Sequence, residues 1–154
     1  MIKQFVPQEM CLHCKGCCRF ATQDSVWQLH LLEEEQKKIG DKIRLLSKVG
    51  GDGFLCSCLD ERSNKCTIYE SRPFECRLYP FVINRRSDQV FLAIDLNCPF
   101  AQGKLHSPQF KEYLKYLVDF LESPLALEIL KNNPQVIQPY DEVFDLAELR
   151  IHSK

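Results

Sequence analysis

Apolar residues repeat at helical spacing in the C-terminal third of the chain. Residues 108–121 are preceded by Ser107, an expected N-cap, and begin with Pro108, which is favoured in the first turn of a helix. Ser123 and Pro124 repeat this start signal before a second short helix that is expected to run to residue 130. Residues 141–151 predict a third helix. The apolar face of the first helix comprises Phe110, Leu114, Leu117 and Leu121.

Residues 33–49 show the same helical spacing closer to the N-terminus. Three glutamates open this segment, basic residues follow, and the glycines at 50, 51 and 53 end it, in the charge order that a helix dipole favours. Its apolar positions are Ile39, Ile43, Leu46 and Val49.

Short extended segments separate these helices. Residues 26–29, 54–55 and 67–69 are expected to be strands, and a helical turn is expected near Ser71, with Pro73 in its first turn. Residues 81–84 and 90–95 are apolar arms around the polar residues 85–88, which predicts a β-hairpin. The fold class is therefore α+β, an irregular region with short strands or a hairpin followed by a helical C-terminal part.

Composition excludes two classes of partner. The 154 residues contain 20 Lys and Arg against 21 Asp and Glu, so no basic surface is expected to attract nucleic acid. No segment approaches the roughly 18 apolar residues of a membrane-spanning helix, and the first twenty residues contain no signal-peptide core. We expect a cytoplasmic protein that binds neither nucleic acid nor membrane.

Cysteine is the unusual component. Nine cysteines lie between Cys11 and Cys98, and none follows. This distribution predicts a metal-binding domain over residues 1–103 and a helical extension, packed on it, over residues 104–154. In a reducing compartment, clustered cysteines hold metal more often than they form disulfides.

The densest motif is C-x2-C-x2-C-C, which runs from Cys11 to Cys18. Two-residue spacing lets two thiolates point into one coordination sphere while backbone N–H groups turn toward the sulfurs. Gly16 is expected to take a positive φ in this turn. Cys17 and Cys18 are adjacent and are expected to diverge, which would place them in different sites.

Further motifs follow: C-x2-L-D from Cys56 to Asp60, C-x-I-Y-x2-R-P-x2-C-R-x-Y-P from Cys66 to Pro80, and Cys98-Pro99. With these pieces the chain resembles the YkgJ-type cysteine-cluster family, also called the CxxCxxCC zinc- or iron-chelating domain, which is also found in a flagellin lysine methylase. The resemblance covers about residues 11–99.

The resemblance implies eight metal-binding cysteines. Alignment of C-x2-L-D leaves Cys58 surplus, although a sulfur two residues away could replace Cys56. The eight thiolates would form two four-cysteine sites or one polynuclear cluster. A partition into two sites places Cys11, Cys14, Cys17 and Cys98 in one and Cys18, Cys56, Cys66 and Cys76 in the other.

The cofactor is expected to be an iron–sulfur cluster, with [4Fe–4S] favoured, or zinc. A C-x2-C-x2-C run with a remote Cys-Pro resembles a ferredoxin ligand set, whereas structural zinc sites usually pair two C-x2-C units. The first hypothesis for function is electron transfer or metal and cluster handling with a redox or protein partner. The alternatives are a structural zinc-binding interaction module and, from the methylase resemblance, a metal-dependent methyltransferase-like enzyme. No catalytic residue is identified.

Other side chains near the cysteines could have either of two roles. Arg19, Arg72 and Arg77 would stabilise the negative charge of a thiolate site, or Arg72 and Arg77 would pair with Glu70 and Glu75. For Tyr69 and Tyr79 we favour core packing over donation to sulfur. His13 could replace a thiolate, but His30, His106 and His152 are expected to be ordinary histidines.

Overall fold

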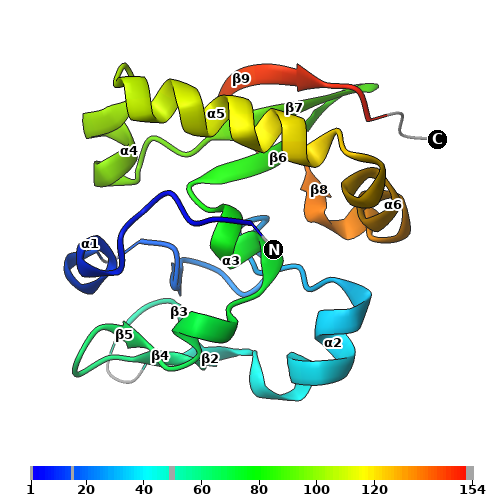
Figure 1. Cartoon of the computed structure of the whole chain (residues 1–154). Helices are drawn as coiled ribbons and strands as arrows, with labels where there is room; N and C mark the ends of the chain where they lie inside the picture. The colour runs from blue at the N-terminus through cyan, green and yellow to red at the C-terminus, as the bar shows by residue number, and fades with distance from the viewer. Residues whose placement is uncertain (1, 15, 49–50, 152–154) are drawn as a thin grey trace.

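The computed structural model describes residues 2–14, 16–48 and 51–151 of the chain. It contains helices and small sheets and is therefore an α+β fold, as predicted. Figure 1 shows a four-stranded sheet and the long helix α5 on one side of the molecule, and the cysteine-containing segments on the other.

The four-stranded sheet has the order β8-β6-β7-β9. Its centre is the predicted hairpin, β6 (Phe81–Arg86) and β7 (Gln89–Ile94). The turn contains only Ser87 and Asp88 and is shorter than expected, because Arg85 and Arg86 belong to β6. Ser87 has a φ of 55°, which closes this two-residue turn. The outer strands β8 (Ile137–Gln138), parallel to β6, and β9 (Phe144–Leu149), antiparallel to β7, come from the end of the chain.

One predicted helix, α5, packs on this sheet, and a second, α6, follows it and packs against α5. In α5 (Pro108–Leu121) the Ser107 hydroxyl accepts a hydrogen bond from the Phe110 amide, and in α6 (Pro124–Asn132) Ser123 accepts one from Ala126. Both start signals are thus confirmed. A short helix α4 (Pro99–Lys104) before α5 and the 3-10 turn η3 (Pro134–Val136) after α6 were not predicted.

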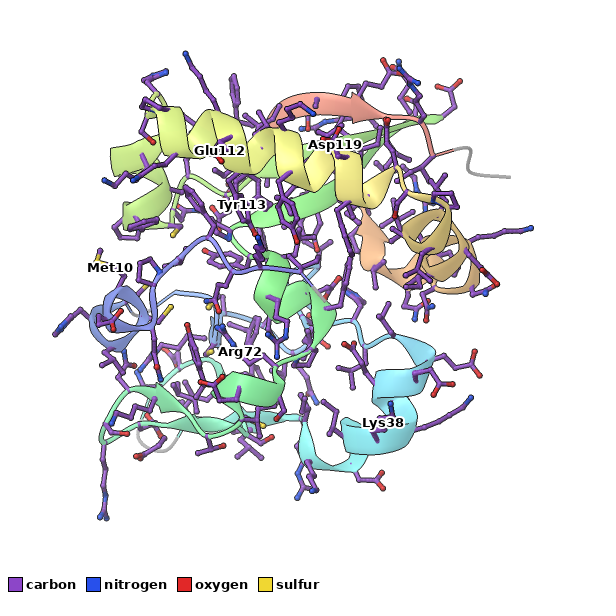
Figure 2. All side chains as sticks on the ribbon, in the orientation of Figure 1. Met10, Lys38, Arg72, Glu112, Tyr113 and Asp119 are labelled. Carbon is purple, nitrogen blue, oxygen red and sulfur yellow. The ribbon has the colours of Figure 1, made fainter. Side chains whose placement is uncertain are left out.

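The hydrophobic core lies between α5 and the sheet. Leu92, Ile94, Leu117 and Leu121 are fully buried there. Figure 2 shows Tyr113 of α5 near the N-terminal segment, where its ring lies 4.9 Å from that of Phe5 and its hydroxyl donates to the Lys3 carbonyl. The N-terminal segment is therefore part of this core.

The cysteine-containing half consists of short elements. They are α1 (Gln8–His13), a sheet of order β1-β3-β2 made by β1 (Arg19–Phe20), β2 (Leu45–Ser47) and β3 (Phe54–Cys56), the pair β4 (Leu59–Asp60) and β5 (Lys65–Cys66), the 3-10 turn η2 (Tyr69–Ser71), and α3 (Phe74–Leu78). The predicted strand at 54–55 is confirmed, and the helical turn near Ser71 is present as η2 and α3. Helix α1 was not predicted.

Four predictions of secondary structure were wrong. The helix expected over residues 33–49 stops early: α2 (Glu33–Ile39) is followed by the 3-10 turn η1 (Gly40–Lys42), and the next residues form β2, because they pair with β3. Val49 and Gly50 lie outside the described residues. Residues 26–29 form turns and coil, and residues 67–69 lie in a turn that leads into η2.

The fourth error is the third C-terminal helix, because most of residues 141–151 form β9 and its flanks. Pairing with β7 and a salt bridge of 3.0 Å between Arg86 and Asp145 hold this segment extended. The boundary at residue 103 stays a prediction, while the sheet joins strands from both sides of it. In the described ranges, none of the helices has the length and apolar character needed to cross a bilayer.

Candidate metal centre

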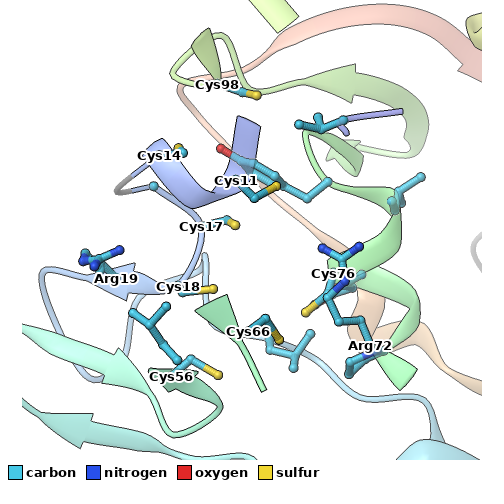
Figure 3. Close-up of a pocket in the computed structure, with 18 of the residues that line it drawn as sticks. Cys11, Cys14, Cys17, Cys18, Arg19, Cys56, Cys66, Arg72, Cys76 and Cys98 are labelled. Atoms are coloured by element: carbon cyan, nitrogen blue, oxygen red, sulfur yellow. The ribbon is translucent and has the colours of Figure 1, made fainter. Parts of the chain in front are cut away.

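All nine cysteines line a single cavity of about 290 Å³. None of them forms a disulfide. Figure 3 shows the cysteines around this space, with Cys14 and Cys98 toward one end and Cys56 and Cys66 toward the other. Segments far apart in the sequence therefore bring their thiols to one place.

Backbone hydrogen bonds join the segments that bear these thiols. The amide of Cys56 in β3 donates to the Cys18 carbonyl at 3.0 Å, next to the β1–β3 pairing. The Arg19 amide donates to the Gly16 carbonyl at 2.9 Å, which closes the turn that contains Cys17 and Cys18. The C-x2-C-C run is thereby attached directly to the strand that carries Cys56.

Three sulfurs accept hydrogen bonds from backbone amides just downstream. Cys56 accepts from Cys58, Cys66 accepts from Ile68, and Cys98 accepts from Phe100 and Ala101 at the start of α4. Hydrogen bonds of this kind stabilise a thiolate and are typical of the loops that hold zinc or iron–sulfur centres. The backbone is thus arranged to favour negative charge on these sulfurs.

Burial opposes that charge. It raises the pKa of Cys56 to about 12, and it raises the pKa of Cys11, Cys66, Cys76 and Cys98 above the ordinary value. A bound cation would offset this cost, because a metal ligates the deprotonated form.

One interaction, between the adjacent thiols of Cys17 and Cys18, is the largest cause of the shifted pKa values of both. It lowers the pKa of Cys18 to about 7 and raises the pKa of Cys17 well above its usual value. The two adjacent side chains therefore point into the same space, and the predicted divergence was wrong.

Cys14 and Cys18 each contribute to the raised pKa values of several other thiols, and Cys17 interacts with Cys11, Cys18 and Cys76. After burial, charge on Cys14 contributes to the raised pKa values of Cys11 and Cys98. Charge on Cys18 contributes, again after burial, to the raised values of Cys56, Cys66 and Cys76.

Cys58 differs from the other cysteines near it. Its side chain is buried, and its sulfur lies 3.9 Å from the Lys42 carbonyl, to which it donates. Its amide serves the neighbouring sulfur of Cys56, as described above. Cys58 thus lines the cavity like the other cysteines, but its thiol already has a backbone partner.

Arg72 and Arg19 are the cations that act on the thiols. Arg72 lies over the Tyr69 ring at 3.6 Å, donates to the Tyr69 carbonyl and to Gln4, and favours the charged form of Cys11 and Cys18. Arg19 also favours charged Cys18. Arg19 and Arg72 therefore place positive charge on two different sides of the cavity.

Arg77 fulfils neither prediction made for it. Its guanidinium donates to the backbone carbonyls of Arg72 and Glu70. Glu75, the other expected partner of the arginines, accepts from the His30 amide at 2.6 Å. Arg77 thus stabilises the turn that presents Arg72.

The tyrosines have polar partners other than sulfur. Tyr79 packs against the core and donates to Asp95 at 2.8 Å, and burial raises its pKa. Tyr69 carries Arg72 on its ring. Among the histidines, His13 and His106 are exposed, His30 Nδ1 lies 3.3 Å from Glu75 Oε1, and His152 is outside the described residues.

Gly16 lies close to a cysteine sulfur. Gly53 is the one glycine with a positive φ among the described residues, so the positive φ expected at position 16 was wrong. A Cβ at position 16 would lie 3.2 Å from Cys14 Sγ. Glycine therefore lets the backbone approach a sulfur closely.

The cysteine side chains are spread around the cavity and do not converge on one point. Over residues 2–14, 16–48 and 51–151, no group of three or more His, Cys, Asp or Glu side chains is close enough to hold a metal ion. The donor set nevertheless suits zinc or iron, because thiolates are soft ligands that select these metals. The assignment of the eight ligands and their division stay predictions.

The comparisons with known proteins agree with this donor chemistry. A family described as "CxxCxxCC: Putative zinc- or iron-chelating domain" matches residues 10–99, more than half of the chain. The protein belongs to this family, and metal chelation is the property it shares with it.

A relative in Methanocaldococcus jannaschii, "Uncharacterized protein MJ0661", is 34% identical over 82 residues. The match covers 47% of this chain and 43% of the relative, so the chain spans less than half of that protein's length. No solved structure matches the chain.

Proposed function

We propose that this protein binds an iron–sulfur centre and acts in electron transfer or in metal and cluster handling. One observation carries the proposal: cysteines from distant segments line a common cavity, and backbone amides already donate to three of their sulfurs. An arrangement of this kind stabilises thiolates, which are the ligands of both zinc and iron–sulfur centres.

The ligands in this proposal are the eight cysteines other than Cys58. The influence of Cys14 on Cys11 and Cys98, and of Cys18 on Cys56, Cys66 and Cys76, supports two sites, while Cys17 interacts with thiols of both. Cys17 and Cys18 are adjacent and both line the cavity, an arrangement that would also allow all eight thiolates to bind a single polynuclear cluster.

The cavity is large enough for a polynuclear centre. About 290 Å³ is far more than one ion among four sulfurs requires. A bound iron–sulfur cluster would supply one-electron chemistry at a potential set by nearby charge and hydrogen bonds. Arg72 and Arg19 would raise that potential by favouring the more negative, reduced state.

The cellular setting of this proposal is the cytoplasm, where thiols remain reduced. Nine free cysteines and the absence of any disulfide among them support a reducing compartment. The proposed partner is a redox protein or a protein that receives the metal or cluster.

Anaerobic purification followed by iron, zinc and sulfide analysis tests the proposal. We expect a brown protein with iron and acid-labile sulfide, whose visible absorption bleaches on reduction. A colourless protein with stoichiometric zinc would contradict it, and so would a protein whose nine thiols all react freely.

A structural zinc module is the second candidate, because the cysteine region has little core of its own. Between residues 8 and 76, Leu55, Cys58 and Pro73 are the buried apolar side chains of the described residues. A region with so little apolar burial needs another source of stability, and tetrahedral zinc supplies it in small domains. Stoichiometric zinc without sulfide would favour this candidate.

A further inference from the structure

Asn64 connects the two cysteine-bearing parts of the chain. It is located in the loop between β4 and β5, and its side-chain nitrogen lies 2.8 Å from the Leu12 carbonyl and 2.7 Å from the Cys14 carbonyl. A longer contact of 3.2 Å reaches the Cys11 carbonyl. These carbonyls end α1, where the last turn of a helix leaves its acceptors without intrahelical donors.

The other end of the Asn64 amide has a cationic partner. Arg19, directly after Cys18, donates to the Asn64 side-chain oxygen at 2.8 Å. Only one orientation of the amide satisfies both ends, because the carbonyls require its N–H groups and the guanidinium requires its oxygen. One side chain thus fixes the Cys11–Cys14 segment and the residue beside Cys18.

The loop is built to place this side chain. Asp60 accepts hydrogen bonds from the Arg62 amide at 3.1 Å and from the Ser63 hydroxyl. Asn64 then takes a φ of 55°, the left-handed conformation that asparagine tolerates better than most residues. The Asp of the C-x2-L-D motif, Asp60, therefore orders the turn that aims Asn64 at α1.

We propose that Asn64 is a positioning residue of the metal centre, holding Cys11 and Cys14 in place relative to Cys18. This inference rests on the proposed metal binding and adds a determinant of affinity outside the ligand set. Residues that orient metal ligands typically change metal affinity by about 10- to 100-fold when replaced.

Asn64→Asp is the sharpest variant. It keeps the size of the side chain, its tolerance of positive φ and the acceptor for Arg19, but it places a carboxylate oxygen against three carbonyl oxygens. Asn132→Asp makes the same chemical change at an exposed residue at the end of α6 and serves as the matched control. Asn64→Gly keeps the backbone conformation without the repulsion and replaces the first variant if that one does not fold.

The experiment measures Co²⁺ binding to the metal-stripped full chain under anaerobic conditions, by competition with a chelator and by thiolate-to-cobalt absorption. We expect Asn64→Asp to bind about 10- to 100-fold more weakly and, at saturation, to show fewer thiolate ligands. A residue that only stabilised the fold would leave the saturated spectrum unchanged.

The results separate this inference from the proposal on which it rests. If the unsubstituted protein gives no thiolate-to-cobalt absorption, metal binding by the cysteines itself fails. If it binds Co²⁺ and the Asn64 variants match it and Asn132→Asp in affinity and spectrum, the positioning role alone is overturned. For Asn64→Gly we expect a smaller loss, close to tenfold.

Discussion

The two halves of this molecule obtain their order in different ways. The half formed by the four-stranded sheet and α5 buries a continuous apolar core, in which Leu92, Ile94 and Leu117 are fully inaccessible. The half from residue 8 to residue 76 has short elements, many half-buried side chains and a cavity surrounded by thiols. Apolar burial therefore accounts for the first half, whereas the second depends on polar contacts and on its cysteines.

The difference shows how one small chain can combine a stable scaffold with a metal site. Side chains such as Phe81 of β6 and Leu78 of α3 contribute to the core, while α3 also carries Cys76 to the cavity. The scaffold thus forms one wall of the site, and the remaining walls are segments that a metal would hold.

The largest effect is expected from removing the metal. A four-thiolate site contributes about 10 to 16 kcal/mol, as much as the whole stability of a typical domain. In stripped protein we expect amide hydrogen exchange to become fast in residues 54–66 and to stay slow in β6, β7 and α5. Protection of residues 54–66 without metal would mean that the cysteine half folds on its own.

The second prediction compares two neighbouring cysteines. Cys56→Ser should weaken metal binding by more than about 100-fold, beyond the range typical of residues that only support ligands. Cys58→Ser should leave the metal content nearly unchanged, because its sulfur contacts the Lys42 carbonyl. Metal analysis of both variants decides the ligand. The reverse result would assign it to Cys58, and equal losses would mean that both sulfurs bind.

The third prediction concerns the apolar half. Leu117→Ala should lower the free energy of unfolding by about 2 to 5 kcal/mol, because it leaves a cavity under α5. Leu125→Ala is the control, since Leu125 is 67% exposed and the same change there should cost about 0.5 kcal/mol or less. Denaturant unfolding measures both. If Leu117→Ala also removed bound metal from the folded protein, the two halves would be less independent than the structure indicates.

The smallest effect is expected at the start of α5. Ser107→Ala removes the acceptor for the Phe110 amide and should cost about 0.5 to 2 kcal/mol, while Ser107→Asn should restore most of the loss. Thermal unfolding of the metal-bound protein is the measurement. Equal stability of Ser107→Ala and the unsubstituted protein would show that the cap contributes nothing here.

The sequence predicted best the elements whose signals are local. The starts of α5 and α6 depend on Ser and Pro at adjacent positions, and the β6–β7 hairpin depends on a polar turn between apolar arms, so a short window suffices. Helix α2 was predicted too long because Ile43 and Leu46 keep a helical spacing, whereas pairing of β2 with β3 decides their conformation. Strand β9 was missed for the same reason, since its partner β7 is distant in sequence.

The candidate site shows the same contrast between local signals, which the sequence reveals, and long-range contacts, which it does not. Spacing and resemblance pointed to the cysteines, all of which line the cavity. The role of Asn64 could not be predicted, because its acceptors lie about fifty positions upstream and a lone asparagine in a loop is typical of a turn. The separate contacts of Arg72 and Arg77 also required the folded structure, since in the sequence both are arginines near a cysteine.

Both outer strands of the four-stranded sheet follow the last cysteine in the chain, and this order has a consequence for synthesis. Asn84, buried in β6, donates to Asp145 at 2.7 Å and accepts from the Tyr140 amide at 2.9 Å. Both of these hydrogen-bond partners are translated more than fifty residues after Asn84. While the ribosome is still adding them, all nine thiols have been made and the edges of the hairpin are open. A released fragment that ends after residue 103 should therefore be able to take up metal without the complete sheet, and metal titration of that fragment would detect it.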